Sequence, residues 1–231
     1  MRKFILMFFA FSIINTAQVA VNPTRPSASD NAFTTAQGYS EIEFGFSSTK
    51  NNWTLPLLLK IGMLQNFEFG FSMNGLLNST NNTEVGNTGL QLKYRFYNKG
   101  RLSIALVGKT EFIKNLDPAY TFYAVPSIVA EAFQVDATFG IKIADDGFGY
   151  NSSFIHAVSL SPNIDEKFGM FAEIFGKMTT NFNPIYLDGG ISYKLSDSFV
   201  IDGSLTYGLN DDAGKDITFQ IGFTSLIFKL F

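Results

Sequence analysis

Charged residues in this 231-residue chain alternate with apolar residues along short segments. In residues 88–97, for example, Lys93 and Arg95 alternate with Leu92 and Tyr94. Side chains spaced by two project from the same face of a β-strand, so each such segment has one ionic face and one apolar face. Charges of both signs gathered on one face could guide or bind a solute, or could neutralise one another. The candidate residues of this ionic or polar face are Lys60, Glu68, Lys93, Arg95, Lys109, Glu111, Tyr123, Asp136, Lys142, Glu173, Tyr186, Asp188, Lys194 and Asp202.

We expect these residues to lie on β-strands, because the same period of two recurs along most of the chain. Turn-forming residues such as Asn98-Lys99-Gly100 separate the alternating segments, which is typical of hairpins. Twelve segments have this pattern, and they are residues 40–48, 53–62, 67–74, 88–97, 101–112, 119–129, 133–143, 153–160, 167–177, 184–194, 198–208 and 216–231.

The apolar faces carry no acidic or basic residue before Lys229, and only His156 interrupts them. Such exclusion is expected of a lipid-facing surface, where a Lys or Arg costs about 2–4 kcal/mol near the midplane. Alternation alone also fits a soluble sandwich or barrel. A closed soluble barrel of twelve strands would, however, enclose more space than side chains usually fill. The charged fraction of 16% is also low for a soluble domain. We therefore predict an all-β fold, a transmembrane antiparallel up-and-down β-barrel of about 12 strands over residues 39–231.

The connections between the segments alternate in length. Gaps such as 75–87 and 144–152 are long, whereas 63–66 and 98–100 are short. Outer-membrane barrels have short periplasmic turns and longer external loops, so this alternation supports the membrane interpretation. The last segment departs from a clean pattern because Lys229 is in phase with apolar neighbours, which predicts a β-bulge there.

The N-terminus has the features of an export signal. A basic start at residues 1–3 precedes an apolar run of 11 residues, too short for a membrane-spanning helix, and small residues follow. We predict a signal peptide at residues 1–20 and an irregular segment at residues 21–38. The expected location is the outer membrane of a Gram-negative bacterium. The expected partners are outer-membrane lipid, a small-molecule solute, and the barrel-insertion machinery acting through the C-terminal strand that ends in Phe231.

Composition excludes several other classes of protein. The chain has no Cys, which removes disulfide frameworks and thiolate metal sites. Its net charge of −3 provides no basic surface for nucleic acid. The acidic loops at residues 145–147 and 210–214 lack the ligand spacing of a calcium loop and suit turns equally well. We expect no cofactor and no metal.

Several short segments resemble one family of outer-membrane proteins. They are RPS at residues 25–27, TLPLLLKIG at 54–62, TGLQLKYRF at 88–96, LDGGISYKL at 187–195 and GLN at 208–210. These segments resemble the transporter family named after the meta-pathway of phenol degradation, although Asn87 stands where that family typically has Asp. The resemblance implies an outer-membrane barrel that transports aromatic or other small compounds. It does not identify the substrate of this chain.

The ionic face is nearly balanced, with eight acidic and seven basic residues. A general anion or cation pore should carry an excess of one sign. Balance therefore leaves two interpretations open: passage or binding of small solutes, or a closed structural barrel whose charges pair across a narrow interior. Tyr123, Phe171, Phe175 and Tyr186 lie in the inner rows and could contact a hydrophobic or aromatic solute, or could simply fill the lumen.

The third interpretation is a lipid-modifying enzyme. His156 is the only His, so it would have to serve any His-dependent site. Its nearest serines, Ser153 and Ser159, are three residues away, and in a strand this spacing places them on the opposite face. We therefore expect no catalytic residues.

Overall fold

The structure is a computed structural model that describes residues 19–79 and 86–231. Nearly all of the signal peptide predicted at residues 1–20 therefore lies outside the described residues. The only helical element in these ranges is the single-turn 3₁₀ helix η1 (Asp211–Ala213). No helix in the described residues is long and apolar enough to cross a membrane.

The chain folds as a series of antiparallel strands. The short β2 and the longer β3 flank residues 55–56 and both pair with β1, so together they make one strand of the wall. Pro56 lies at this interruption, where its missing N–H removes a ladder hydrogen bond. The strands are β1 (Tyr39–Ser48), β2 (Trp53–Thr54), β3 (Leu57–Leu64), β4 (Phe67–Met73), β5 (Thr88–Lys99), β6 (Leu102–Phe112), β7 (Ala119–Val129), β8 (Phe133–Asp145), β9 (Tyr150–Pro162), β10 (Phe168–Met178), β11 (Ile185–Ser196), β12 (Phe199–Gly208) and β13 (Ile217–Lys229).

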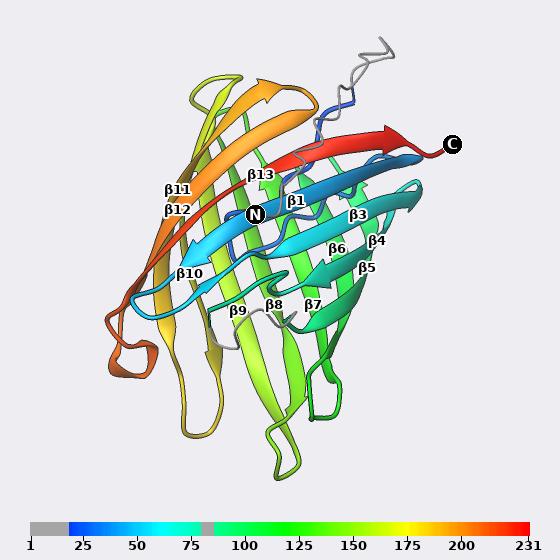
Figure 1. The fold of residues 1–231 in the computed structure, drawn as a ribbon. Helices are drawn as coiled ribbons and strands as arrows, with labels where there is room; N and C mark the ends of the chain where they lie inside the picture. The colour runs from blue at the N-terminus through cyan, green and yellow to red at the C-terminus, as the bar shows by residue number, and fades with distance from the viewer. Residues whose placement is uncertain (1–18, 80–85) are drawn as a thin grey trace, which may run out of the picture.

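Each strand pairs with its neighbours in sequence, and β13 pairs with β1, so the sheet closes on itself (Figure 1). The predicted all-β, twelve-stranded antiparallel barrel is confirmed. Predicted strand ends agree with the observed ones to within about three residues; β7 has the predicted bounds, and β9 is longer at both ends. The bulge predicted in the last strand is confirmed, because the β1–β13 register shifts where Ser40 and Glu41 face Phe228 and Leu226.

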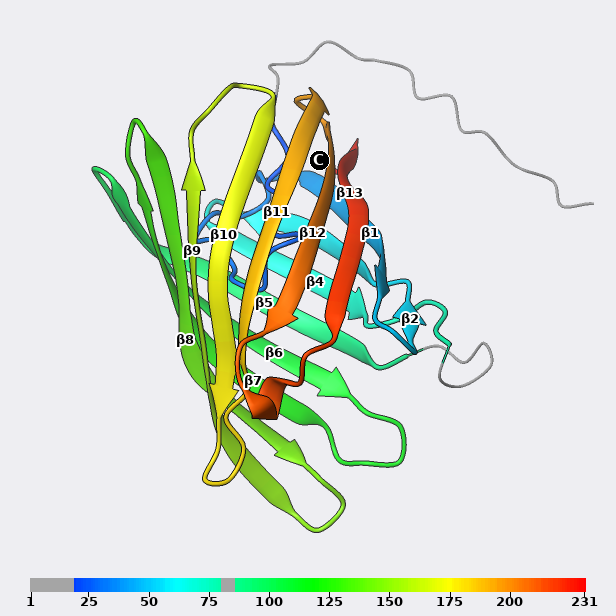
Figure 2. The same cartoon turned by 90° about the vertical axis from the view of Figure 1, so that its left-hand side faces the viewer.

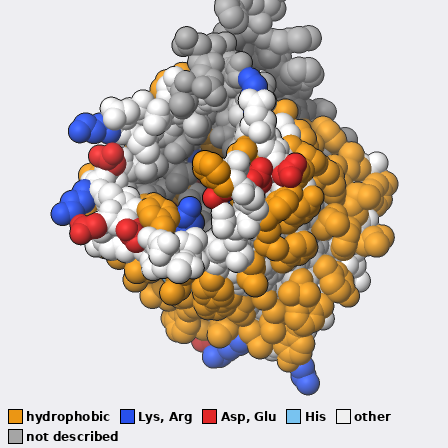
Figure 3. Space-filling view, turned by 90° about the horizontal axis from the view of Figure 1, so that it is seen from below, with side chains coloured by type: hydrophobic (Ala, Val, Ile, Leu, Met, Phe, Trp, Pro, Cys, Tyr) orange, Lys and Arg blue, Asp and Glu red, His pale blue; other side chains and the backbone are white. Residues whose placement is uncertain are grey.

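The wall of the barrel has an apolar outer face and a polar inner face. In mid-strand Leu106 is 52% exposed, whereas Lys93 on the neighbouring strand is 0% exposed. Soluble proteins usually bury apolar side chains and expose charged ones, and the barrel has the reverse arrangement. This arrangement follows from the period-two pattern of the sequence. Figure 3 shows hydrophobic side chains covering much of the outer wall, while charged side chains gather around the mouth of the barrel.

The two ends of the barrel differ. The β3–β4, β5–β6 and β11–β12 connections are tight turns, and they lie at the same end as the C-terminus (Figure 2). The longer β4–β5, β6–β7, β8–β9, β10–β11 and β12–β13 loops lie at the opposite end. We refer to these as the turn end and the loop end. Residues 19–38, the N-terminal segment, lie inside the barrel toward the turn end before the chain enters β1.

Candidate solute site in the barrel lumen

None of the predicted polar-face residues lies exposed on the outer wall. Eight of them are buried, and these are Lys60, Glu68, Lys93, Tyr123, Asp136, Glu173, Asp188 and Asp202. The other six are half-buried, and these are Arg95, Lys109, Glu111, Lys142, Tyr186 and Lys194. The period-two pattern thus brings the whole set to the interior of the barrel.

The N-terminal segment binds the inner wall through carboxylates that accept its hydrogen bonds. Glu173 of β10 accepts hydrogen bonds from Ser27 Oγ at 2.6 Å and from the backbone N–H groups of Ala28 and Ser29 at 2.9 Å. Glu43 of β1 accepts from the backbone N–H and the hydroxyl of Thr24, at 2.8 and 2.9 Å. Hydrogen bonds to an ionised acceptor are stronger than neutral ones, so these contacts fix the segment across the lumen.

A second set of contacts holds the later part of the segment. Asp30 pairs with Lys93 Nζ at 2.6 Å and accepts a hydrogen bond from Tyr123 Oη at 3.0 Å. Glu68 accepts the backbone N–H of Thr35 at 2.7 Å. Burial alone would raise the pKa of Asp30, but Lys93, the nearby Lys109 ammonium and the Tyr123 hydroxyl hold it below its ordinary value. The Asp30 carboxylate therefore stays ionised inside the barrel.

Arg25 anchors the N-terminal segment to β12. Its Nη2 lies 3.3 Å from Asp202 Oδ1 of β12. The guanidinium lies against Gly45 of β1 and Gly222 of β13, which face each other in register. A Cβ at either glycine would collide with the guanidinium, so these two glycines provide the space that the Arg25 side chain occupies.

The closed-barrel interpretation expects charges to pair across a narrow interior, and the observed ion pairs between residues of the wall differ from that expectation. Lys60 lies 2.8 Å from both Glu41 and Glu43, two residues of the adjoining strand. At the loop end, Lys142 pairs with Glu111 at 3.1 Å. Glu173 and Glu68 instead accept backbone N–H groups of the N-terminal segment, and Asp202 pairs with Arg25 of that segment.

The other predicted residues have local partners or none. Arg95 donates to the side-chain oxygen of Asn66 at the β3–β4 turn, and Lys194 pairs with Asp197. Asp136 accepts from Gln134 at 2.8 Å. Tyr186 stacks on Phe175, with ring centroids 5.0 Å apart. Asp188 is 2% exposed, and its Oδ1 has no hydrogen-bond partner among the described residues.

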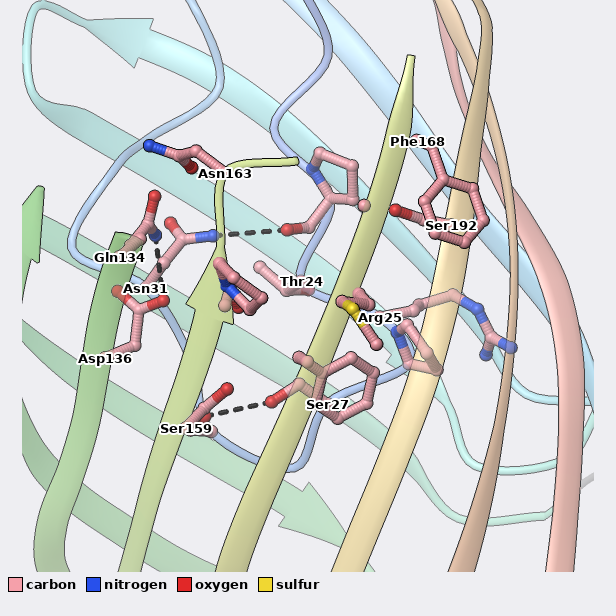
Figure 4. A pocket seen from close by; sticks show the side chains of 18 of the residues that line it. Thr24, Arg25, Ser27, Asn31, Gln134, Asp136, Ser159, Asn163, Phe168 and Ser192 are labelled. Carbon is pink, nitrogen blue, oxygen red and sulfur yellow. Dashed lines mark hydrogen bonds between the residues drawn. The ribbon is translucent and has the colours of Figure 1, made fainter. Parts of the chain in front are cut away.

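Three cavities lie in the lumen, and the N-terminal segment borders all of them. A cavity of about 250 Å³ opens toward the turn end between β8, β9, β10 and β11 (Figure 4). Two cavities of about 410 and 210 Å³ open toward the loop end, where Lys109 lines both. Residues 24–27 line the turn-end cavity on one side and the larger loop-end cavity on the other. The N-terminal segment thus forms a partition between the two ends of the barrel.

The position of this partition in the lumen could not be predicted from the sequence. Residues 21–38 have no strand periodicity, so the pattern gave them no position. One signal was present: Arg25 and Asp30 interrupt a stretch otherwise rich in Ser, Thr, Asn and Pro, and the barrel that follows has charges on its inner face. Buried charges require partners, and a polar segment directly before the first strand can supply them.

The alternative sites considered from sequence acquire no chemical partners in the structure. His156 stacks on Phe154, and its Nδ1 has no hydrogen-bond partner within the described residues. Ser159 faces the lumen and is buried there, on the other side of the wall. In the acidic loops the side chains cap turns, since Asp145 accepts the Gly147 N–H and Asn210 accepts the Ala213 N–H. The described residues contain no cluster of three potential metal ligands.

No protein-family model matches the sequence. A comparison with curated proteins finds no match either. Solved structures do match: one is a KdgM porin in complex with disordered oligogalacturonate, 11% identical, with a TM-score of 0.67 over 81% of this chain and 99% of that chain. A NanC porin is 12% identical, with a TM-score of 0.62 over 82% and 100% of the two chains. An outer-membrane channel from Pseudomonas putida is 10% identical, with a TM-score of 0.65 over 90% and 100%. These similarities show a porin-like barrel fold.

Proposed function

We propose that this protein is an outer-membrane channel that passes or binds small solutes, with the N-terminal segment as the partition that controls passage. The observation that carries this proposal is the presence of cavities at both ends of the barrel, with residues 24–27 shared between them. A barrel that served only as a structural element would have no need of cavities that meet at one thin segment.

The outer surface supports the membrane location. The exposed large hydrophobic side chains include residues from nearly every strand, and they alternate with inward polar residues. Such a closed barrel has no free edge and satisfies its backbone hydrogen bonds internally, which is what a bilayer requires. On this proposal, the barrel-insertion machinery would act on β13 and on Phe231, which follows it.

The proposal extends to the family and the class of solute. The segments at residues 54–62 and 88–96 support membership of the family named after the meta-pathway of phenol degradation. Phe171, which lines the turn-end cavity, and the stacked pair Phe175 and Tyr186 give a solute apolar surface inside a polar lumen. Hydrophobic or aromatic small molecules are therefore the solutes to test first.

Liposome uptake tests the proposal directly. Mature protein is reconstituted into liposomes, and entry of small neutral solutes of increasing size is followed by swelling. We expect uptake of the smallest solutes that rises with the amount of folded barrel. Absence of flux for every solute, with the barrel folded, would favour the closed structural barrel instead.

The enzyme alternative has its own test. Lipid hydrolysis by the purified protein that disappears in His156→Ala would support it. The missing hydrogen-bond partner of His156 Nδ1 gives the ring no group to orient it for catalysis, and we expect no hydrolysis.

A further inference from the structure

Lys109 of β6 differs from the other lumen lysines that line or adjoin the cavities. Lys60, Lys93 and Lys142 each form an ion pair with a carboxylate. Lys109 forms no ion pair and no hydrogen bond with any group of the described chain; its Nζ lies 5.1 Å from the centre of the Tyr123 ring. A cation inside a barrel that has no hydrogen-bond acceptor in direct contact is costly unless a ligand or water provides one.

The carboxylates that line the two cavities together with Lys109 are Asp30, Glu43 and Glu111, and each is already engaged by other donors. Asp30 is held by Lys93 and Tyr123, Glu43 by Lys60 and Thr24, and Glu111 by Lys142. The Lys109 ammonium therefore faces the cavities with its hydrogen-bonding capacity unused.

The surroundings of Lys109 combine polar and apolar side chains. In register, Gln91 of β5 and Thr121 of β7 flank it, and both line the same cavities. Leu58, Tyr123 and Ile155 give the smaller cavity an apolar side, and the rest of its wall is polar, formed mainly by the N-terminal segment. Tyr123 packs in the one buried apolar cluster found within the described residues, with Ile155 against it.

We propose that this place binds a small monocarboxylate with an apolar body, the carboxylate at Lys109 and the apolar part against Leu58, Tyr123 and Ile155. One unpaired ammonium matches one negative charge, and a charge-assisted hydrogen bond is the strongest contact available to it. The two cavities that meet at Lys109, about 410 and 210 Å³, open toward the loop end, so the ligand enters from that side. The site deepens the proposed function, since it assigns the channel a solute class.

The test measures binding without requiring transport. Folded protein in detergent is dialysed to equilibrium against radiolabelled benzoate, and in parallel against benzamide, which has the same ring without the charge. We expect saturable benzoate binding and no benzamide binding above the detergent background. In Lys109→Met we expect benzoate affinity to fall about tenfold or more, because a charged hydrogen bond is lost.

Two variants separate the site from general effects of charge. Lys215→Met removes an exposed lysine in the β12–β13 loop, at the end where the cavities of Lys109 open, and it should bind benzoate as the wild type does. Lys109→Arg keeps the charge and should retain binding. Equal benzoate affinity in Lys109→Met and wild type, equal binding of benzamide, or no benzoate binding by the folded wild type would each overturn the proposal.

The outcome of the dialysis experiment is independent of the outcome of the liposome experiment. A protein that binds benzoate in detergent but passes no solute keeps the Lys109 site and loses the channel function. A protein that passes solutes but does not bind benzoate keeps the channel and loses the site.

Discussion

At the scale of single residues, the partition depends on a few inward carboxylates that accept hydrogen bonds from it. Glu173 holds three consecutive residues of the N-terminal segment, and Arg25 lies on a floor made of two glycines. Both features can be changed without altering the outer wall, because their side chains face the lumen. Substitutions at these positions can therefore test the partition without changing the stability of the barrel.

Glu173→Gln should loosen the N-terminal segment. The substitution replaces a charged acceptor by a neutral amide, whose N–H₂ group would face the donors of the N-terminal segment. It should weaken the binding of the segment to β10 by about 1.5–3 kcal/mol. Chymotrypsin cleavage after Phe33 should become faster by about tenfold, whereas cleavage after Phe148, which is 100% exposed in the β8–β9 loop, should not change. Glu131→Gln in an exposed turn is the control. Unchanged cleavage after Phe33 would show that Glu173 does not hold the segment.

Gly45→Ala should displace the Arg25 guanidinium and break its pair with Asp202. The three atoms nearest to the added Cβ all belong to the Arg25 side chain, so we expect the side chain to move rather than the strand. We expect faster hydrogen exchange in residues 22–30 and unchanged exchange in β1. Gly189→Ala, whose Cβ would make an ordinary contact at 3.6 Å, should have no effect. Faster exchange throughout β1 would instead indicate damage to the barrel.

At the scale of elements, the alternation of residues in each strand determines which of its faces points into the lumen. A shift of one residue would turn every inward charge of a strand outward, so the alternation fixes the register as well as the fold. This is why strand bounds such as those of β7 could be predicted from the sequence alone.

The strands could be predicted from their period-two pattern, whereas the path of the N-terminal segment, which has no such pattern, could not. The path of residues 21–38 depends on hydrogen bonds from backbone N–H groups, such as those of Ala28 and Thr35, to side chains more than thirty positions away. Backbone groups are the same in every residue, so no residue type marks such contacts. The pairing of Asp202 could not be predicted for a different reason: its partner Arg25 lies 177 positions away in the sequence, in a segment whose path is not periodic.

Leu106→Lys tests the orientation of β6. The side chain lies on the outer wall in mid-strand and is 52% exposed; a lysine there should cost about 2–4 kcal/mol if it meets the bilayer interior. We expect poorer folding into lipid vesicles, read as loss of the heat-modifiable band in gel electrophoresis. Leu116→Lys, in the β6–β7 loop, should fold as the wild type does. Equal folding of both variants would mean that Leu106 does not face lipid.

At the scale of the whole molecule, a closed barrel with an apolar outer wall encloses a polar lumen that is divided by its own N-terminal segment. On the proposed function, the cavities on either side of residues 24–27 are the two halves of one path. The same segment provides donors to inward carboxylates, since Glu173 and Glu43 accept its hydrogen bonds and Asp202 pairs with Arg25. Release of the segment should open the path and leave these carboxylates without their donors.

Planar-bilayer conductance tests this account most directly, with the mature chain compared to a variant that lacks residues 22–35. The account predicts that both chains insert and that the shortened chain conducts several times more current, because no segment then divides the lumen. Heat-modifiable mobility confirms that the shortened barrel is folded, and Glu173→Gln should give an intermediate conductance. Equal conductance of the folded shortened chain and the full mature chain would contradict the account.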